Sequence, residues 1–121
     1  QVLDSFNHRT YADGQAGAMY GHLPPLANAS KVPGAWQSYD IIFEAPRWEG
    51  GKIAKKACVT VIHNGVILHH KQEYPGPTRH RGVGNYEQPH APKGPIQLQD
   101  HSNPMRFRNI WIRHLGQYDQ K

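Results

Sequence analysis

The chain alternates between hydrophobic and polar side chains in several short stretches, and this period of two predicts β-strands. The clearest cases are the stretches 36–44, 57–63 and 66–70. The last two flank Asn64-Gly65, the favoured two-residue turn of a β-hairpin, because both of its positions need a positive φ. A shorter strand is expected at 17–21, where small residues allow another segment to approach closely.

The closing stretch 94–115 shows the same alternation twice and contains much of the candidate chemistry. One face of its first half carries amides and an imidazole: Gln97, Gln99 and His101. The opposite face carries Ile96 and Leu98, which are expected to enter the core. The residues 102–104, Ser-Asn-Pro, favour a turn. After that turn Arg106 and Arg108 alternate with apolar residues, so a hairpin would set two guanidinium groups beside the amides.

This polar surface has two interpretations. It is either a binding site or the solvated outer face of an antiparallel sheet, for which alternating polar residues are ordinary. The stretch 72–95 is a long loop rich in Gly and Pro, and loops of that length are commonly functional or mobile. Because it precedes the closing stretch directly, it is expected to form a rim or lid.

Composition narrows the class of protein. A chain of 121 residues with 12 Gly, 10 Pro and 37% hydrophobic residues indicates one domain of short strands. The net charge of +5 permits anionic partners, but the basic residues are spread out, which disfavours a nucleic-acid partner. No apolar run reaches the ~20 residues of a membrane-spanning helix. The single Cys58 excludes an internal disulfide, and its apolar neighbours predict a buried strand thiol.

The closing stretch, GPIQLQDHSNPMRFRNIWIRHL, resembles the final motif of the 3-keto-disaccharide hydrolase family, long catalogued as a domain of unknown function. Other pieces resemble the family in the same order: QVLDSF, YADGQAGAMYG, PPLANAS, PGAWQSYDIIFEAPRW, VTVIHNGVIL and PGPT. The resemblance implies an all-β, concanavalin A-like jelly-roll sandwich of two antiparallel sheets. It also implies that residues 1–115 are the C-terminal portion of one such domain, without its N-terminal strands, followed by a polar tail at 116–121.

The resemblance further implies a bacterial, periplasmic or extracellular enzyme that cleaves 3-keto-glycosides. In a sugar oxidised at C3, a base can remove the C2 proton, and the glycosidic oxygen then leaves by elimination before water adds. A conventional glycosidase is disfavoured, because no Glu-x-Asp-x-x-Glu strand supplies its paired carboxylates. The alternative is a non-catalytic carbohydrate-binding module of the same fold. The expected partners are a carbohydrate and either a second chain with the N-terminal strands or a further copy of this chain.

The candidate site residues come from two sources: most match the family motifs residue by residue, while Trp36, Arg106 and Arg108 are added for their chemistry. The catalytic candidates are His101 as base, Arg108 beside the developing enolate, and Asp40. The candidates for substrate binding are polar or aromatic: Gln1, Asp4, Tyr20, Trp36, His63, Gln97, Gln99 and Arg106. A glutamate that precedes Gln1 in the family is the other candidate base, and Arg106 the other candidate for the enolate.

Several of these candidates have a second, structural interpretation. Asp40 is either a site group or a solvated partner of a basic residue across the sheet. Tyr20 and Trp36 either contact a sugar or fill core. No cofactor is identified. A divalent metal ion could supply positive charge near the enolate, but none of the compact metal-ligand spacings is present near His63 or the pair His69-His70.

Overall fold

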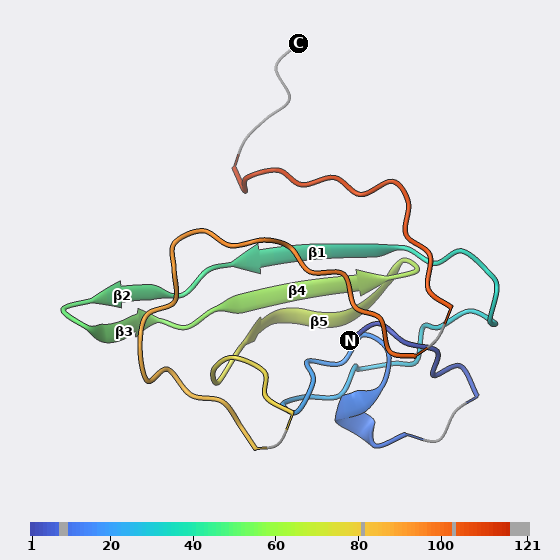
Figure 1. Cartoon of the computed structure of the whole chain (residues 1–121), viewed down its shortest axis with the longest axis horizontal. Coiled ribbons are helices and arrows are strands. Elements are labelled where there is room, and N and C mark those ends of the chain that lie inside the picture. Colours follow the sequence, from blue (N-terminus) through green and yellow to red (C-terminus); the bar gives the residue numbers. More distant parts are fainter. Residues whose placement is uncertain (8–9, 81, 103, 117–121) are drawn as a thin grey trace, which may run out of the picture.

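The computed structural model describes residues 1–7, 10–80, 82–102 and 104–116. In these ranges the secondary structure is almost entirely β, with one short 3-10 helix (Figure 1). The elements in chain order are η1 (Ala12–Gly14), β1 (Tyr39–Glu44), β2 (Arg47–Glu49), β3 (Lys52–Lys55), β4 (Cys58–His63) and β5 (Val66–Glu73). Every strand pair is antiparallel, which confirms the predicted all-β class with two antiparallel sheets. A search of the described ranges finds no helix able to cross a membrane.

The central sheet has the strand order β1-β4-β5, so β4 is paired on both of its edges. Its register places Tyr39 opposite His63, and His63 opposite Val66. The short ribbon of β2 and β3 continues from the ends of β1 and β4 (Figure 1). An ion pair between Glu44 and Lys55 joins the sheet to the ribbon.

The β4–β5 hairpin confirms the turn prediction. Asn64 and Gly65 have φ values of 51° and 81°, the left-handed geometry that a two-residue hairpin turn requires. The strand β5 reaches Glu73, three residues beyond the predicted end. A bulge accompanies this extension, because Lys71 has a φ of 45° and its backbone N–H donates to Thr60 Oγ1 at 2.9 Å.

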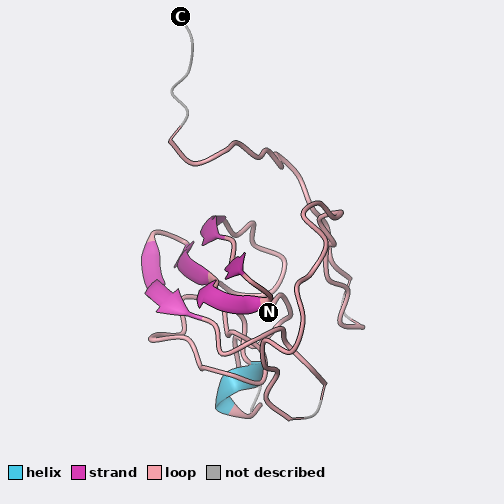
Figure 2. Ribbon diagram, turned by 90° about the vertical axis from the view of Figure 1, so that its left-hand side faces the viewer, coloured by secondary structure: helices cyan, strands magenta, loops and turns pink. Residues whose placement is uncertain are grey.

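The core lies on one face of β4 and β5, where the N-terminal segment with η1 packs (Figure 2). The buried apolar residues at its centre are Met19, Val59, Val61 and Leu68. A buried hydrogen bond at 2.9 Å joins His69 Nε2 to Gly17 O and ties the N-terminal segment to β5. A side chain at Gly17 would overlap Leu68, so this close approach needs glycine.

Three predicted elements need correction. The strand expected at 17–21 is wrong: the chain turns there, and Met19 bridges to Leu23. Glycines with positive φ at both ends of that stretch permit the turn. The strand expected at 36–44 begins only at Tyr39, because residues 30–38 are held by irregular side-chain hydrogen bonds instead of a ladder. The thiol of Cys58 is half-buried, since it lies on the β4 face opposite the core.

The two strands predicted in the closing stretch are also wrong. Where the structure describes 94–116, the chain is extended but belongs to no strand. Figure 1 shows its first part crossing in front of the central sheet and its later part running apart from β1. Because no neighbouring strand pairs with this stretch, Ile96 and Leu98 remain exposed where a core position was expected. The predicted tail at 116–121 lies outside the described residues except for Gly116.

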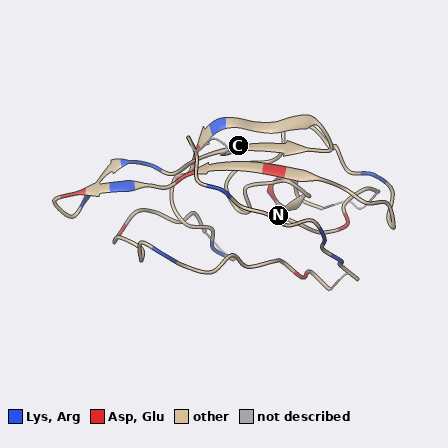
Figure 3. Cartoon of the chain, turned by 90° about the horizontal axis from the view of Figure 1, so that it is seen from above, with Lys and Arg blue, Asp and Glu red and all other residues tan. Residues whose placement is uncertain are grey.

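The basic residues are scattered, as the sequence predicts. Figure 3 shows Lys and Arg distributed over strands and loops on both sides of the molecule. Three ion pairs link oppositely charged side chains within the described ranges: Arg47–Glu49, Lys55–Glu44 and Arg79–Glu87. All six side chains are well exposed, so these pairs contribute little to folding.

Candidate functional site

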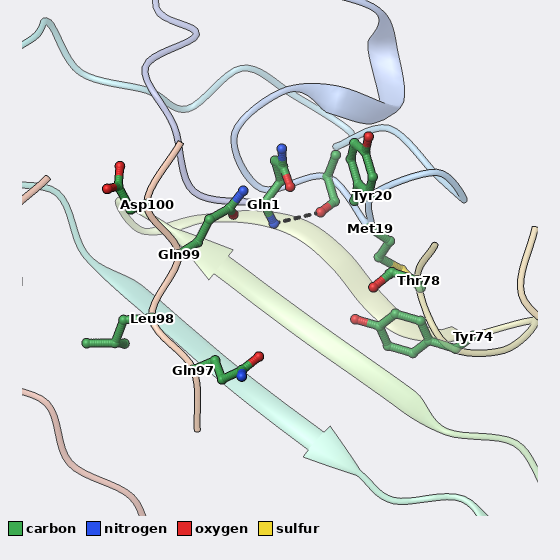
Figure 4. Close-up of a pocket in the computed structure, with 10 residues that line it drawn as sticks. Gln1, Met19, Tyr20, Tyr74, Thr78, Gln97, Leu98, Gln99 and Asp100 are labelled. Atoms are coloured by element: carbon green, nitrogen blue, oxygen red, sulfur yellow. Dashed lines mark hydrogen bonds between the residues drawn. The ribbon is translucent and has the colours of Figure 1, made fainter. Parts of the chain in front are cut away.

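An open pocket of about 780 Å³ lies between the first residues, the turn at 17–21, the loop after β5 and residues 97–100 (Figure 4). This volume is within the range of about 300–1,000 Å³ that ligand sites occupy. Amide and hydroxyl groups dominate the polar part of its wall. The lining residues are Gln1, Ala18, Met19, Tyr20, Tyr74, Thr78, Gln97, Leu98, Gln99 and Asp100.

Gln99 is fixed by a hydrogen bond to a residue that is distant in the sequence. Its Oε1 accepts from the backbone N–H of Val2 at 2.7 Å, which ties the closing stretch to the N-terminal segment. The backbone nitrogen of Gln1 in turn donates to Ala18 O at 2.9 Å (Figure 4). With its oxygen occupied, Gln99 keeps its NH₂ group as a donor for a ligand. Gln97 forms no hydrogen bond within the described part of the chain, so its whole amide is available.

Tyr74 and Thr78 belong to the pocket but were not predicted as site residues. Tyr74 follows β5 directly, and its backbone N–H donates to Ala57 O at 2.8 Å. The loop that carries Thr78 is held by backbone packing, because a Cβ atom at Gly76 or Gly84 would overlap backbone atoms across the loop. The only sequence signal for these residues is the PGPT piece, which shares this loop.

Tyr20 contributes its ring to the wall, while its hydroxyl has partners outside the lining. The hydroxyl of Tyr11 donates to Tyr20 Oη at 3.2 Å, and His80 Nδ1 lies 3.4 Å from the same oxygen. The hydrogen bond to Tyr20 raises the pKa of Tyr11. The negative charge that Tyr20 carries when it is ionised raises this pKa further. Tyr20 is therefore positioned by other side chains and exposes an aromatic surface to the pocket.

Four predicted site residues thus meet at one pocket: Gln1, Tyr20, Gln97 and Gln99. His101 follows the pocket residue Asp100, is exposed and does not itself line the pocket. Asp40 is exposed on β1 opposite Ile62. The roles proposed for His101 and Asp40 therefore remain predictions.

Neither arginine is among the lining residues. Arg108 places its guanidinium 3.8 Å from the centroid of the Trp36 ring, a cation–π contact that holds the closing stretch against the loop before β1. Arg106 is exposed. At the N-terminal end, Asp4 Oδ1 accepts from the backbone N–H of Phe6 at 3.1 Å, a local turn outside the pocket.

His63 is part of the core side of the sheet. It is 1% exposed, and its ring stacks on Tyr39 with centroids 4.1 Å apart. Its Nε2 lies 3.0 Å from Gln37 Oε1. Burial, with a smaller effect of the Lys31 charge, lowers the pKa of His63. These contacts give His63 a packing role in the described structure.

The divalent ion that the sequence left open has no ligand set here. Among the residues with described positions, no three His, Cys, Asp or Glu side chains lie close enough together to hold a metal ion. The described residues therefore do not form a metal site by themselves.

The fold and the pocket define an antiparallel all-β domain with an open, largely polar pocket. The chain belongs to the 3-keto-alpha-glucoside-1,2-lyase-like domain family, whose model matches residues 1–113. This match confirms the resemblance seen in the sequence motifs. No curated protein matches the chain.

A crystal structure of a proposed glycosyl hydrolase from Parabacteroides distasonis is similar to this chain, with 41% sequence identity and a TM-score of 0.71. The similarity covers 75% of this chain and 39% of the other. This chain therefore corresponds to well under half of that protein.

Proposed function

We propose that this chain carries the substrate pocket of an enzyme that cleaves 3-keto-glycosides by elimination and then hydration. The observation that carries the proposal is the open pocket lined by Gln97, Gln99, Thr78 and Tyr74, in a member of a family named for 3-keto-α-glucoside lyases. The solved relative, described as a proposed glycosyl hydrolase, supports the same general activity.

The chemistry of the wall supports a neutral, hydroxyl-rich ligand. Amides and hydroxyls both donate and accept hydrogen bonds, as a sugar's hydroxyl groups do. No Lys or Arg is among the described lining residues, so no basic side chain there attracts a phosphate or carboxylate. The rings of Tyr20 and Tyr74 and the side chain of Met19 add apolar surface for the C–H face of a pyranose.

The proposed reaction begins with a base that takes the C2 proton of the oxidised sugar. The electrons of the C2–H bond form C2=C3, and the carbonyl becomes an enolate. The enolate then restores C3=O and forms C1=C2, while the C1–O bond breaks and the glycosidic oxygen takes up a proton. Water adds across C1=C2 afterwards. This chain's candidate bases are Asp100, a lining residue whose Oδ1 accepts from the backbone N–H of Ser102 at 3.0 Å, and His101, the next residue in the sequence.

The direct test is incubation of the purified protein with a 3-keto-α-glucoside. We expect release of the leaving group and no release from the same glucoside left unoxidised at C3, because only the ketone makes the C2 proton acidic. Chromatography of the freed aglycone or sugar measures both. Equal cleavage of the two substrates would contradict the elimination route, and binding of the keto-glucoside without cleavage would reject the proposed activity.

The second candidate function is a non-catalytic carbohydrate-binding module. One observation favours it: among the described lining residues most polar groups are neutral, and Asp100 has the only carboxylate. Binding without cleavage, with the keto and unoxidised sugars bound equally well, is the result that this alternative predicts.

A further inference from the structure

The hydroxyl of Tyr74 differs from those of the other tyrosines that the structure describes. The hydroxyls of Tyr11 and Tyr20 bond to each other, and that of Tyr39 lies 3.5 Å from Gln1 O. The hydroxyl of Tyr86 donates to Tyr74 O at 3.0 Å and accepts from the backbone N–H of Ala57 at 2.8 Å. Only the hydroxyl of Tyr74 has no hydrogen-bond partner within the described ranges, although its ring is half-buried.

The free hydroxyl faces the pocket. Figure 4 shows the phenol of Tyr74 pointing into the space between Thr78 and Gln97. A half-buried hydroxyl without a protein partner costs stability unless water or a ligand satisfies it. An unpaired donor directed into a pocket is therefore a natural contact for a ligand oxygen.

The ring that carries this hydroxyl is held firmly. It forms T-shaped ring contacts with Phe43, with centroids 6.4 Å apart, and with His22, with centroids 6.3 Å apart. The backbone of Tyr74 is fixed on both sides, since its N–H donates to Ala57 O and its carbonyl accepts from Tyr86. Such a donor needs little reorganisation when negative charge develops beside it.

We propose that Tyr74 is a catalytic residue whose hydroxyl donates a hydrogen bond to the C3 oxygen of a 3-keto-sugar and stabilises the enolate formed there. This inference rests on the proposed function and names the group that holds the reacting carbonyl. The sequence indicates Arg108 and Arg106 as candidates for that role, but neither residue lines the pocket. Thr78 and Gln97 would hold the hydroxyls next to the carbonyl.

The proton stays on Tyr74 throughout the step. The base removes the C2 proton, negative charge moves to the C3 oxygen, and the hydrogen bond from Tyr74 strengthens without transfer. When the enolate collapses, the C3 carbonyl re-forms and the glycosidic oxygen leaves. Burial, with a smaller effect of Tyr86, raises the pKa of Tyr74, so the phenol remains a donor at neutral pH.

The test is Tyr74→Phe, which keeps the ring contacts and removes only the hydroxyl. We expect kcat/KM for a 3-keto-α-glucoside to fall about 100-fold, mostly in kcat, because the lost bond is strongest in the transition state. The thermal unfolding temperature should stay within error of the wild type. Turnover that does not change would overturn the inference.

Tyr86→Phe is the matched control, because its hydroxyl holds backbone groups instead of facing the pocket. It should lower the unfolding temperature and affect turnover less than Tyr74→Phe. A larger loss of turnover in Tyr86→Phe would mean that loop order, and not a donor at Tyr74, supports catalysis.

A binding measurement separates failure of this inference from failure of the proposed function. Calorimetry compares the 3-keto-glucoside with its unoxidised parent for wild type and Tyr74→Phe. If the wild type binds the keto-sugar more tightly but does not cleave it, the proposed reaction fails, while loss of that preference in Tyr74→Phe still supports the contact. If the wild type binds neither sugar, both proposals are overturned.

Discussion

The β4–β5 hairpin and the closing stretch 94–115 have the same alternating sequence pattern, but only the hairpin forms strands. Leu68 in β5 is 0% exposed, whereas Leu98 in the closing stretch is 50% exposed. The strand β4 lies between two partners and presents one face to the N-terminal segment. The closing stretch is attached by separate contacts instead: Gln99 to the backbone of Val2, and Arg108 to Trp36.

This difference shows what alternation specifies. It fixes which side chains share a face: Figure 4 shows Gln97 and Gln99 on one side of the closing stretch and Leu98 and Asp100 on the other, although all four line the pocket. It does not supply the neighbouring strand that satisfies the backbone and covers the apolar face. Where that neighbouring strand is present, the alternating stretch forms a strand. Where the described structure has no such neighbour, the apolar residues stay exposed.

The largest effect should come from truncating the hairpin core. Leu68→Ala removes a fully buried side chain that packs with Met19, Val59 and Val61. We expect the free energy of unfolding to fall by about 3 kcal/mol, the usual loss for a buried leucine. Urea denaturation followed by tryptophan fluorescence measures this change.

The matched control is Leu98→Ala in the closing stretch. Because Leu98 is half exposed and packs in no core cluster, its truncation should change the free energy of unfolding by less than about 0.5 kcal/mol. Similar losses in the two variants would show that the closing stretch is packed in solution and would remove the contrast between the two regions.

Substitution of a turn glycine should have a smaller effect on the free energy of unfolding. Gly65→Ala places a Cβ atom at a position with φ of 81° and should cost about 1–2 kcal/mol. Gly94→Ala, at the start of the closing stretch, meets no atom within 4 Å of the added Cβ and should be close to neutral. The same denaturation series compares the two variants, and an equal cost at both positions would contradict the assigned turn.

Acid should lower the free energy of unfolding through two histidines of the β4–β5 hairpin. Burial lowers the pKa of both His63 and His69 in the folded state. Below the ordinary histidine pKa of about 6.5, the unfolded chain then binds more protons than the folded chain. Stability is therefore fully present above that pH and is lost as pH falls toward the folded pKa values.

Unfolding temperatures between pH 8 and pH 5 test this expectation. His69→Gln, which keeps a donor for Gly17 O, should reduce the loss of stability in acid. His70→Gln changes an exposed histidine of the same strand and should leave the pH dependence as in the wild type. If His69→Gln is as acid-sensitive as the wild type, the buried imidazole of His69 is not the cause.

Local signals explain what the sequence predicted correctly. Asn64-Gly65 determines a turn within two residues, so the hairpin followed from neighbouring positions alone. The strand expected at 17–21 failed because its glycines adopt a positive φ and the chain turns back on itself. Apolar alternation could not distinguish that outcome from a strand.

The candidate site was predicted only in part for a related reason. Gln97 and Gln99 were found by pattern and family motif, and both line the pocket. Tyr74 was missed because its proposed role rests on a hydroxyl without a hydrogen-bond partner among the described residues, which no sequence pattern records. Arg108 was expected near the amides, but the ring of Trp36 holds it elsewhere.

Gln97 and Gln99 provide the last and smallest test, because they share a predicted face but differ in what they bind. Gln99→Leu removes the acceptor of the Val2 N–H and should lower the free energy of unfolding by about 1 kcal/mol. It should also speed hydrogen exchange at the Val2 amide. Gln97→Leu removes no hydrogen bond to the described residues, so it should weaken sugar binding while leaving stability unchanged. A stability loss confined to Gln97→Leu would mean that the attachment of the closing stretch has been assigned to the wrong residue.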